Sequence, residues 1–194
     1  MICLLTACTL PVRAADRAAE LLAALSARFR AMTSYETEFA VTAGDQCVTG
    51  RYVVAGDRYY IAVGDVEAFA DGRVRREVDN RHREVTLVAV ETENRNILSD
   101  PAHAFDLLDG AYRPTLLAER DGTAQIRLDP VSGGAAPIGV VTVTLDTATL
   151  SPRSLVYDYD GVRVAVDIVR VVSGAALPQF DPTRYPGYEF IDFR

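Results

Sequence analysis

Apolar and polar residues alternate over most of the stretch from Gly50 to Val90. A period of two is typical of β-strands with one buried face and one face in water. Pairs of Gly, Asp and Asn interrupt the alternation where tight hairpin turns are expected. We therefore predict four or five consecutive antiparallel strands joined by short turns. The alternating apolar residues are Tyr52, Val54, Tyr59, Ile61, Val63, Val74, Val78, Val85 and Leu87.

One amphipathic helix is predicted before these strands, over residues 16–33. Asp16 is placed to cap its N-terminus. Its apolar residues recur at i, i+3, i+4 and i+7, which predicts a helix packed on a sheet. A helix on a membrane surface is the alternative, but the polar side mixes charges instead of being uniformly basic. The apolar stripe consists of Ala18, Leu21, Leu22, Leu25, Phe29 and Met32.

The remaining chain continues the β pattern, with one interruption at residues 96–110, where a change of period predicts short helical turns. Further strands are predicted over residues 35–41, 112–119, 124–129, 139–145, 154–159 and 162–171. About eleven antiparallel strands in one twisted sheet should curl. We therefore predict a mainly β fold, an incomplete antiparallel barrel or half-barrel covered by the N-terminal helix and the helical insert. Residues 15–194 are expected to form one domain.

Residues 1–14 predict a secretory signal peptide. An apolar run from Ile2 to Leu10 precedes the small-residue pattern that ends at Ala14. No basic segment precedes the run, so the true start of the signal is expected to lie upstream. Cys8 supports an alternative, since residues 5–8 match the pattern in which a cysteine is acylated and becomes the first residue. Both interpretations place the domain outside the cytoplasm.

Composition and motifs limit the chemistry. The formal net charge of −7 argues against a nucleic-acid partner. His82 and His103 have no cysteine or carboxylate at ligand spacing, so no metal site is expected. Without a nucleophile motif or a phosphate loop, we expect neither an enzyme nor a cofactor. Hydrophobic residues make up 49% of the chain, which fits either a filled core or a cavity for an apolar ligand.

Short motifs then follow one another in a recognisable order. An L-x-x-x-F pattern in the helix precedes a strand with Glu38-Phe39, a strand pair from Gly50 to Tyr60 that contains G-D-R-Y, and three further motifs. These are Asp71-Gly72-Arg73, Asp79-Asn80 and Glu84-Val85-Thr86, and an aromatic tail closes the chain over residues 180–194. The order resembles the periplasmic outer-membrane lipoprotein carrier family (LolA-like) over essentially the whole mature chain.

The resemblance implies an unclosed barrel with lid helices and an apolar cavity for the acyl chains of lipoproteins. It also implies a monomer in the periplasm that takes cargo from an inner-membrane transporter and passes it to an outer-membrane acceptor. Arg58 corresponds to an arginine that bonds the lid to the barrel. The expected cavity lining is Phe39, Val41, Tyr52, Val54, Tyr59, Ile61, Val63, Phe69, Leu87, Leu98 and Phe105.

Two alternatives of similar fold remain open. The first is a lipid-anchored acceptor in the outer membrane, with Cys8 acylated. The second is a sensing module that binds a lipid or lipoprotein signal.

Overall fold

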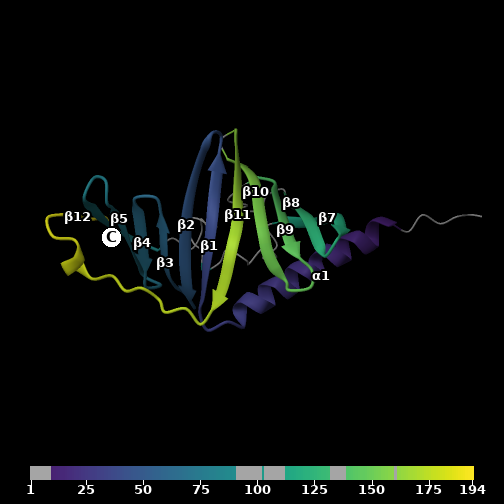
Figure 1. Cartoon of the computed structure of the whole chain (residues 1–194), viewed down its shortest axis with the longest axis horizontal. Coiled ribbons are helices and arrows are strands. Elements are labelled where there is room, and N and C mark those ends of the chain that lie inside the picture. Colours follow the sequence, from purple (N-terminus) through teal and green to yellow (C-terminus); the bar gives the residue numbers. More distant parts are fainter. Residues whose placement is uncertain (1–9, 91–101, 103–111, 132–138, 160) are drawn as a thin grey trace, which may run out of the picture.

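A computed structural model describes residues 10–90, 102, 112–131, 139–159 and 161–194. Within these ranges one long helix accompanies a single sheet of twelve strands (Figure 1). The helix α1 spans Leu10–Arg30, and a short 3₁₀ helix spans Pro182–Arg184. The strands are β1 (Tyr35–Ala43), β2 (Gln46–Ala55), β3 (Arg58–Val63), β4 (Val66–Ala70), β5 (Val74–Asp79), β6 (Glu84–Ala89), β7 (Tyr112–Arg120), β8 (Thr123–Pro130), β9 (Val141–Asp146), β10 (Ser151–Tyr159), β11 (Val162–Ser173) and β12 (Glu189–Asp192).

The sheet is open, as predicted. Its strand order is β12-β6-β5-β4-β3-β2-β1-β11-β10-β9-β8-β7, so β12 and β7 are its edges. Two antiparallel meanders, β1–β6 and β7–β11, are joined through the antiparallel pair of β1 and β11. The strand missing from the prediction is β12, which pairs with β6 in parallel. Residues 174–188, which connect β11 to β12, bring the end of the chain back across the sheet to β6.

The apolar stripe of α1 is confirmed, but its predicted start is wrong. Ala18, Leu21, Leu22, Leu25 and Phe29 are all buried. Asp16 does not cap the helix, because α1 begins at Leu10 and already includes this residue. The alanine-rich residues 14–19 favour helix, so the turn that Asp16 would have capped is continued instead. Among the described residues, no helix is long and apolar enough to cross a membrane.

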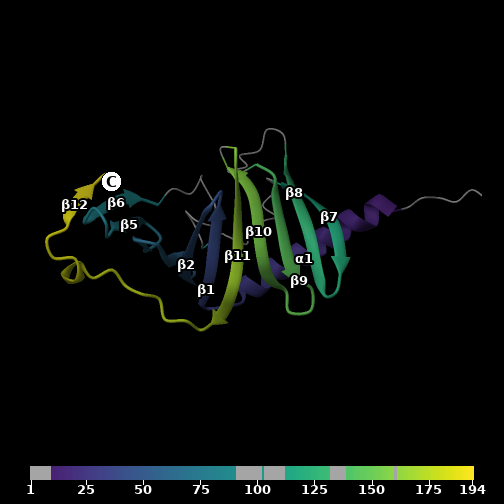
Figure 2. The same ribbon diagram turned by 45° about the horizontal axis from the view of Figure 1, so that its top comes forward.

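The two faces of the sheet carry separate apolar clusters. We call one the α1 face, because α1 packs on it beneath β7–β11 in both views (Figures 1 and 2). Its cluster takes buried residues from α1, β1–β4 and β8–β11. We call the opposite side the tail face, because the C-terminal residues 174–194, here called the tail, cover part of it. Its buried residues are Val53, Tyr60, Phe69, Val78, Val85 and Tyr185.

The expectation that one face of β2–β6 is wet is therefore wrong. On β2 and β3, the side chains of Tyr52 and Ile61 point to the α1 face. Their neighbours Val53 and Tyr60 point to the tail face. Strands buried on both sides have continuous apolar runs, and the sequence contains such runs at residues 52–54, 59–61 and 68–70. The strict alternation used for the prediction overlooked them, because it counted every second residue.

Polar contacts attach α1 to the sheet in its N-terminal half and near its C-terminal end. Arg17 donates hydrogen bonds to the carboxylate of Glu119 on β7, with Nη2 2.9 Å from Oε1. Near the other end, Arg28 Nη1 donates to the carbonyl of Leu150 at 3.0 Å and to Ser151 Oγ at 2.7 Å. These bonds join the helix to the edge strand β7 and to the β9–β10 turn, so α1 is held across one half of the sheet.

Candidate functional site

The predicted cavity residues divide between the two faces. Phe69 and Leu87 lie on the tail face. Leu98 and Phe105 lie outside the described residues, as does the rest of the predicted insert apart from Ala102, which packs against the α1-face cluster. The structure brings together the other seven on the α1 face: Phe39, Val41, Tyr52, Val54, Tyr59, Ile61 and Val63.

A chain of aromatic rings forms the centre of the α1 face. Phe29 at the end of α1 meets Tyr35 edge to face, with ring centroids 4.9 Å apart. Tyr35 meets Tyr52 at 6.1 Å, and Tyr52 meets Phe39 at 5.7 Å. Phe39 lies over Gly50, its partner in the β1–β2 register. These rings connect the helix to the strands beyond its end, where α1 no longer covers the sheet (Figure 2).

Two buried hydroxyl groups interrupt this apolar centre. Thr37 and Tyr52 are a cross-strand pair on β1 and β2, and they are 0% and 1% exposed. Burial raises the pKa of Tyr52, and the neighbouring Thr37 hydroxyl moderates the rise. The two groups do not reach hydrogen-bond geometry, and neither oxygen has another partner within the described residues. Buried polar atoms without a partner are rare, so this pair requires an explanation.

The margin of the α1 face is less deeply buried than its centre. Val41 near the end of β1 and Val63 at the end of β3 are half-buried and pack against the cluster. Ile61 is only 5% exposed and belongs to the core. A ligand that lies on this face would therefore meet the marginal residues first, and a substitution there would disturb the fold least.

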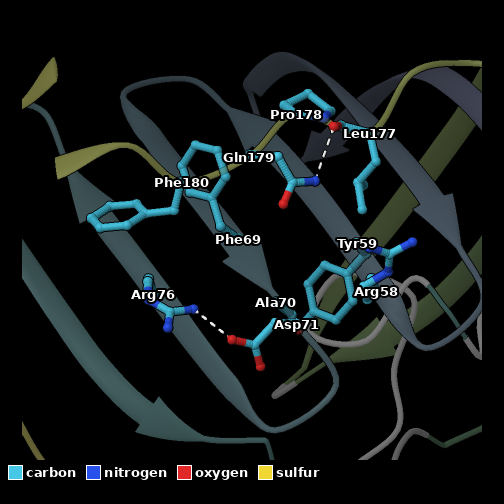
Figure 3. A pocket seen from close by; sticks show the side chains of 10 residues that line it. All are labelled: Arg58, Tyr59, Phe69, Ala70, Asp71, Arg76, Leu177, Pro178, Gln179 and Phe180. Atoms are coloured by element: carbon cyan, nitrogen blue, oxygen red, sulfur yellow. Dashed lines mark hydrogen bonds and ion pairs between the residues drawn. The ribbon is translucent and has the colours of Figure 1, made fainter. Parts of the chain in front are cut away.

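The tail face holds a pocket of about 250 Å³ between β3–β5 and the tail (Figure 3). Its lining residues are Arg58, Tyr59, Phe69, Ala70, Asp71, Arg76, Leu177, Pro178, Gln179 and Phe180. Arg58 is exposed at the start of β3 and lies beside the tail, on the side of the sheet away from α1. Within the described part of the chain, α1 is bonded to the sheet by Arg17 and Arg28, which are not part of the apolar stripe of the helix.

The ionised carboxylate of Asp71 organises one wall of this pocket. Backbone N–H groups of Val74 and Arg73 donate to Oδ1 at 2.9 and 3.0 Å, and Arg76 Nη1 donates to Oδ2 at 2.9 Å. The hydrogen bond from Val74 and those from Arg76 and Arg73 lower the pKa of Asp71 to about 2. Arg76 also lies over the ring of Phe180, 5.7 Å from its centroid. The tail is thereby connected to the turn between β4 and β5.

We expect Asp71→Asn to make the thermal stability of the protein depend less on pH in the acid range. The folded pKa is about 2 and the ordinary value is 3.8, so the fold favours the ionised form. Its contribution is present above pH 3.8 and is lost as the pH falls towards 2. Thermal unfolding followed between these pH values should show a shallower slope for the variant. Asp65→Asn, at an exposed carboxylate of the β3–β4 turn, should keep the original slope. Equal slopes in all three proteins would contradict the assignment.

Glu67 fixes the middle of the tail to the sheet. Tyr60 donates its hydroxyl to Oε1 at 2.6 Å, and Tyr185 donates to Oε2 at 3.1 Å. Burial and the hydrogen bond to this carboxylate raise the pKa of Tyr60 to about 12; burial and the nearby Glu67 charge raise that of Tyr185 to about 12. Both hydroxyls therefore stay protonated and act as donors. Tyr185 thereby joins the buried residues of the sheet in the tail-face cluster, and Leu177 and Phe180 of the tail pack against it.

In the part of the chain that is described, no group of three or more His, Cys, Asp or Glu side chains is placed to hold a metal ion.

Comparisons with known proteins find similarity in structure but not in sequence. No family model matches the chain, and no curated protein matches it. An uncharacterized conserved protein from Thermus thermophilus is similar over 90% of this chain and 98% of its own, with a TM-score of 0.57 and 7% identity. MucB is similar over 84% of this chain and 61% of its own, with a TM-score of 0.53 and 15% identity.

A LolA superfamily protein from Nitrosomonas europaea is also among the similar structures, with a TM-score of 0.40, 10% identity and coverage of 87% of this chain and 96% of its own. At these identities the comparisons concern the fold alone. That fold is the one predicted from the sequence, an unclosed, mainly antiparallel sheet with a helix across one face.

Proposed function

We propose that the chain is an exported carrier that holds the acyl chains of lipoproteins against the α1 face. The observation that carries the proposal is the continuous apolar face of an open sheet, of which α1 covers only the half beneath β7–β11. Burying an acyl chain is worth roughly 0.8 kcal/mol per CH₂ group, so a modest apolar surface suffices for reversible capture. Carriage of this kind makes and breaks no covalent bond, so we propose no catalytic residue.

The buried hydroxyls of Thr37 and Tyr52 support this proposal. Both belong to the apolar centre of the α1 face, yet neither has a hydrogen-bond partner in the described structure. A lipoprotein acyl chain brings an ester or amide carbonyl with it, and a hydroxyl donor would satisfy that carbonyl in an apolar site. A plain hydrocarbon has no hydrogen-bond acceptor, so it would leave both hydroxyls without a partner.

The cellular role that we propose follows the fold similarity. The carrier would act as a monomer in the periplasm, take acylated lipoproteins from an inner-membrane transporter and deliver them to an outer-membrane acceptor. The contacts of Arg17 and Arg28 would hold α1 as a lid whose movement widens or narrows the α1 face. The exposed Arg17–Glu119 pair contributes little stability, so it would not prevent such movement.

The test is displacement of an environment-sensitive apolar dye from the purified protein by a synthetic triacylated lipopeptide. We expect saturable displacement by the lipopeptide and none by the same peptide without acyl chains, because only acyl chains compete for apolar surface. Circular dichroism verifies that the protein is folded. Absence of dye binding to folded protein would mean that the α1 face is filled, and the carrier proposal would fail.

The lipid-anchored acceptor is distinguished by its N-terminus. Mass spectrometry of the exported protein would show an unmodified start near Ala15 for the carrier. An acylated Cys8 would favour the acceptor instead.

A further inference from the structure

The tail-face pocket has features that the acyl-carrier proposal does not use. It lies on the opposite side of the sheet from the α1 face, and it is formed jointly by the sheet and the tail (Figure 3). We propose that this pocket binds the C-terminal residue of a peptide whose last side chain is apolar or aromatic. The occupant would be recognised by its carboxylate, its side chain and its backbone N–H.

Charge favours an anionic group. Of the charged side chains that line the pocket, Arg76 and Asp71 form an ion pair at 2.9 Å, which leaves Arg58. Arg58 is exposed, and its guanidinium has no hydrogen bond or ion pair with the side chain or backbone of another described residue. The pocket therefore carries a net positive charge in a chain whose formal net charge is −7. A guanidinium binds a carboxylate through two parallel hydrogen bonds, so a free carboxylate matches Arg58.

The apolar wall and the volume favour a single side chain. Phe69 and Phe180 meet edge to face with centroids 5.6 Å apart, and Leu177 continues the wall on the tail. The volume of about 250 Å³ corresponds to roughly eight water molecules at liquid density. That is enough for one large side chain with its carboxylate, and it is below the roughly 300–1,000 Å³ typical of pockets for larger ligands.

Gln179 favours a peptide over a simple fatty acid. Its Nε2 donates to the carbonyl of Leu177 at 3.2 Å, so the amide is oriented by the tail itself. Its Oε1 accepts no hydrogen bond from another described residue and lies at the pocket (Figure 3). A backbone N–H of a peptide could donate to this oxygen, whereas a fatty acid has no N–H to offer.

The probe is N-acetyl-L-phenylalanine, which has the carboxylate, the ring and one amide N–H. Its neutral match is N-acetyl-L-phenylalaninamide. Binding to the purified full chain is followed by two-dimensional NMR, so that the affected residues are identified. We expect the acid to bind with a Kd on the order of 1 mM, with shifts at β3–β5 and residues 177–180. The amide should bind about tenfold more weakly, because it lacks the charge-assisted hydrogen bonds.

Arg58→Gln should weaken binding of the acid by about tenfold and leave binding of the amide unchanged. The matched control is Arg163→Gln, which removes one exposed arginine from β11, away from the pocket. An equal loss in both variants would mean that only total charge matters, and the proposal would be overturned. It would also be overturned if the acid failed to shift these residues, or if octanoate bound there as tightly as the acid.

This inference is independent of the proposed function. Lipopeptide displacement of the apolar dye should be the same for Arg58→Gln and the unmodified protein, since Arg58 is not on the α1 face. Failure of the dye assay would therefore leave the peptide pocket standing, and failure of the NMR assay would leave the carrier standing.

Discussion

Gly50→Val is expected to lower the free energy of unfolding by about 2 kcal/mol, although valine favours strands. Gly50 is on β2 opposite Phe39. A Cβ atom at this position would lie 2.7 Å from Phe39 Cζ and 2.8 Å from the carbonyl oxygen of Ala62. Phe39 is 2% exposed and packs on Tyr52, so its ring has little room to move. Overpacking of this kind typically costs about 1–3 kcal/mol. Urea unfolding followed by circular dichroism measures the effect.

Two comparisons show whether the close approach is the cause. Gly139→Val places its Cβ 4.0 Å from the carbonyl oxygen of Asp158, an ordinary contact distance, and it should change the stability little. Phe39→Leu removes the ring atoms that the new side chain would meet. In that background Gly50→Val should cost less than in the unmodified protein, which is a measurable coupling between contacting residues. A full cost in both backgrounds would place the strain at the Ala62 carbonyl instead.

The local elements could be predicted because their causes are local. Gly56 and Gly64 adopt positive φ angles of 61° and 55° at two of the predicted turns, as hairpins require. A period of 3.6 in the sequence predicts the apolar stripe of α1, and a period of 2 predicts the strands β7–β11. The open sheet was expected from the number of strands. In each case the residues that determine the local conformation are close to one another in the sequence.

The pairing of distant segments could not be predicted in the same way. The strand β12 pairs with β6, about a hundred residues earlier, and a Pro-broken segment gives no periodic signal for it. The tail also covers the second face of β2–β6, which strict alternation predicts to be wet. Phe69 and Leu87 were therefore grouped with residues on the other side of the sheet. The aromatic residues of the tail, Phe180 and Tyr185 among them, were the sign in the sequence that the tail packs against another part of the protein.

The candidate site shows the same division. The seven predicted residues that share the α1 face are on β1–β3, where they occupy every second position of each strand. The contacts of α1 were not predicted, because a helical pattern does not show which strand an exposed arginine reaches. Arg58 was assigned to the lid by its resemblance to a family motif. Its place at the start of β3 instead puts it beside the tail.

Val41→Glu is expected to weaken binding of a triacylated lipopeptide by about 100-fold or more while the protein remains folded. Val41 belongs to the α1 face but is half-buried at its margin, so water can still reach a carboxylate there in the free protein. An acyl chain on the same surface would have to desolvate that charge, which costs several kcal/mol. Ile61→Glu would be less informative, because Ile61 is 5% exposed and the charge would disrupt the core. Dye displacement gives the affinity, and thermal unfolding verifies the fold.

Thr42→Glu is the matched control for this prediction. Thr42 is the next residue of β1, is also half-buried and faces the opposite side of the sheet. Both variants add one negative charge at nearly the same place in the sequence, so any effect of net charge on the lipopeptide is shared. We expect Thr42→Glu to bind as the unmodified protein does. Equal binding by the two variants would show that acyl chains do not lie on the α1 face. The two charges are on opposite sides of one strand, so they can have the same effect only when neither contacts the ligand.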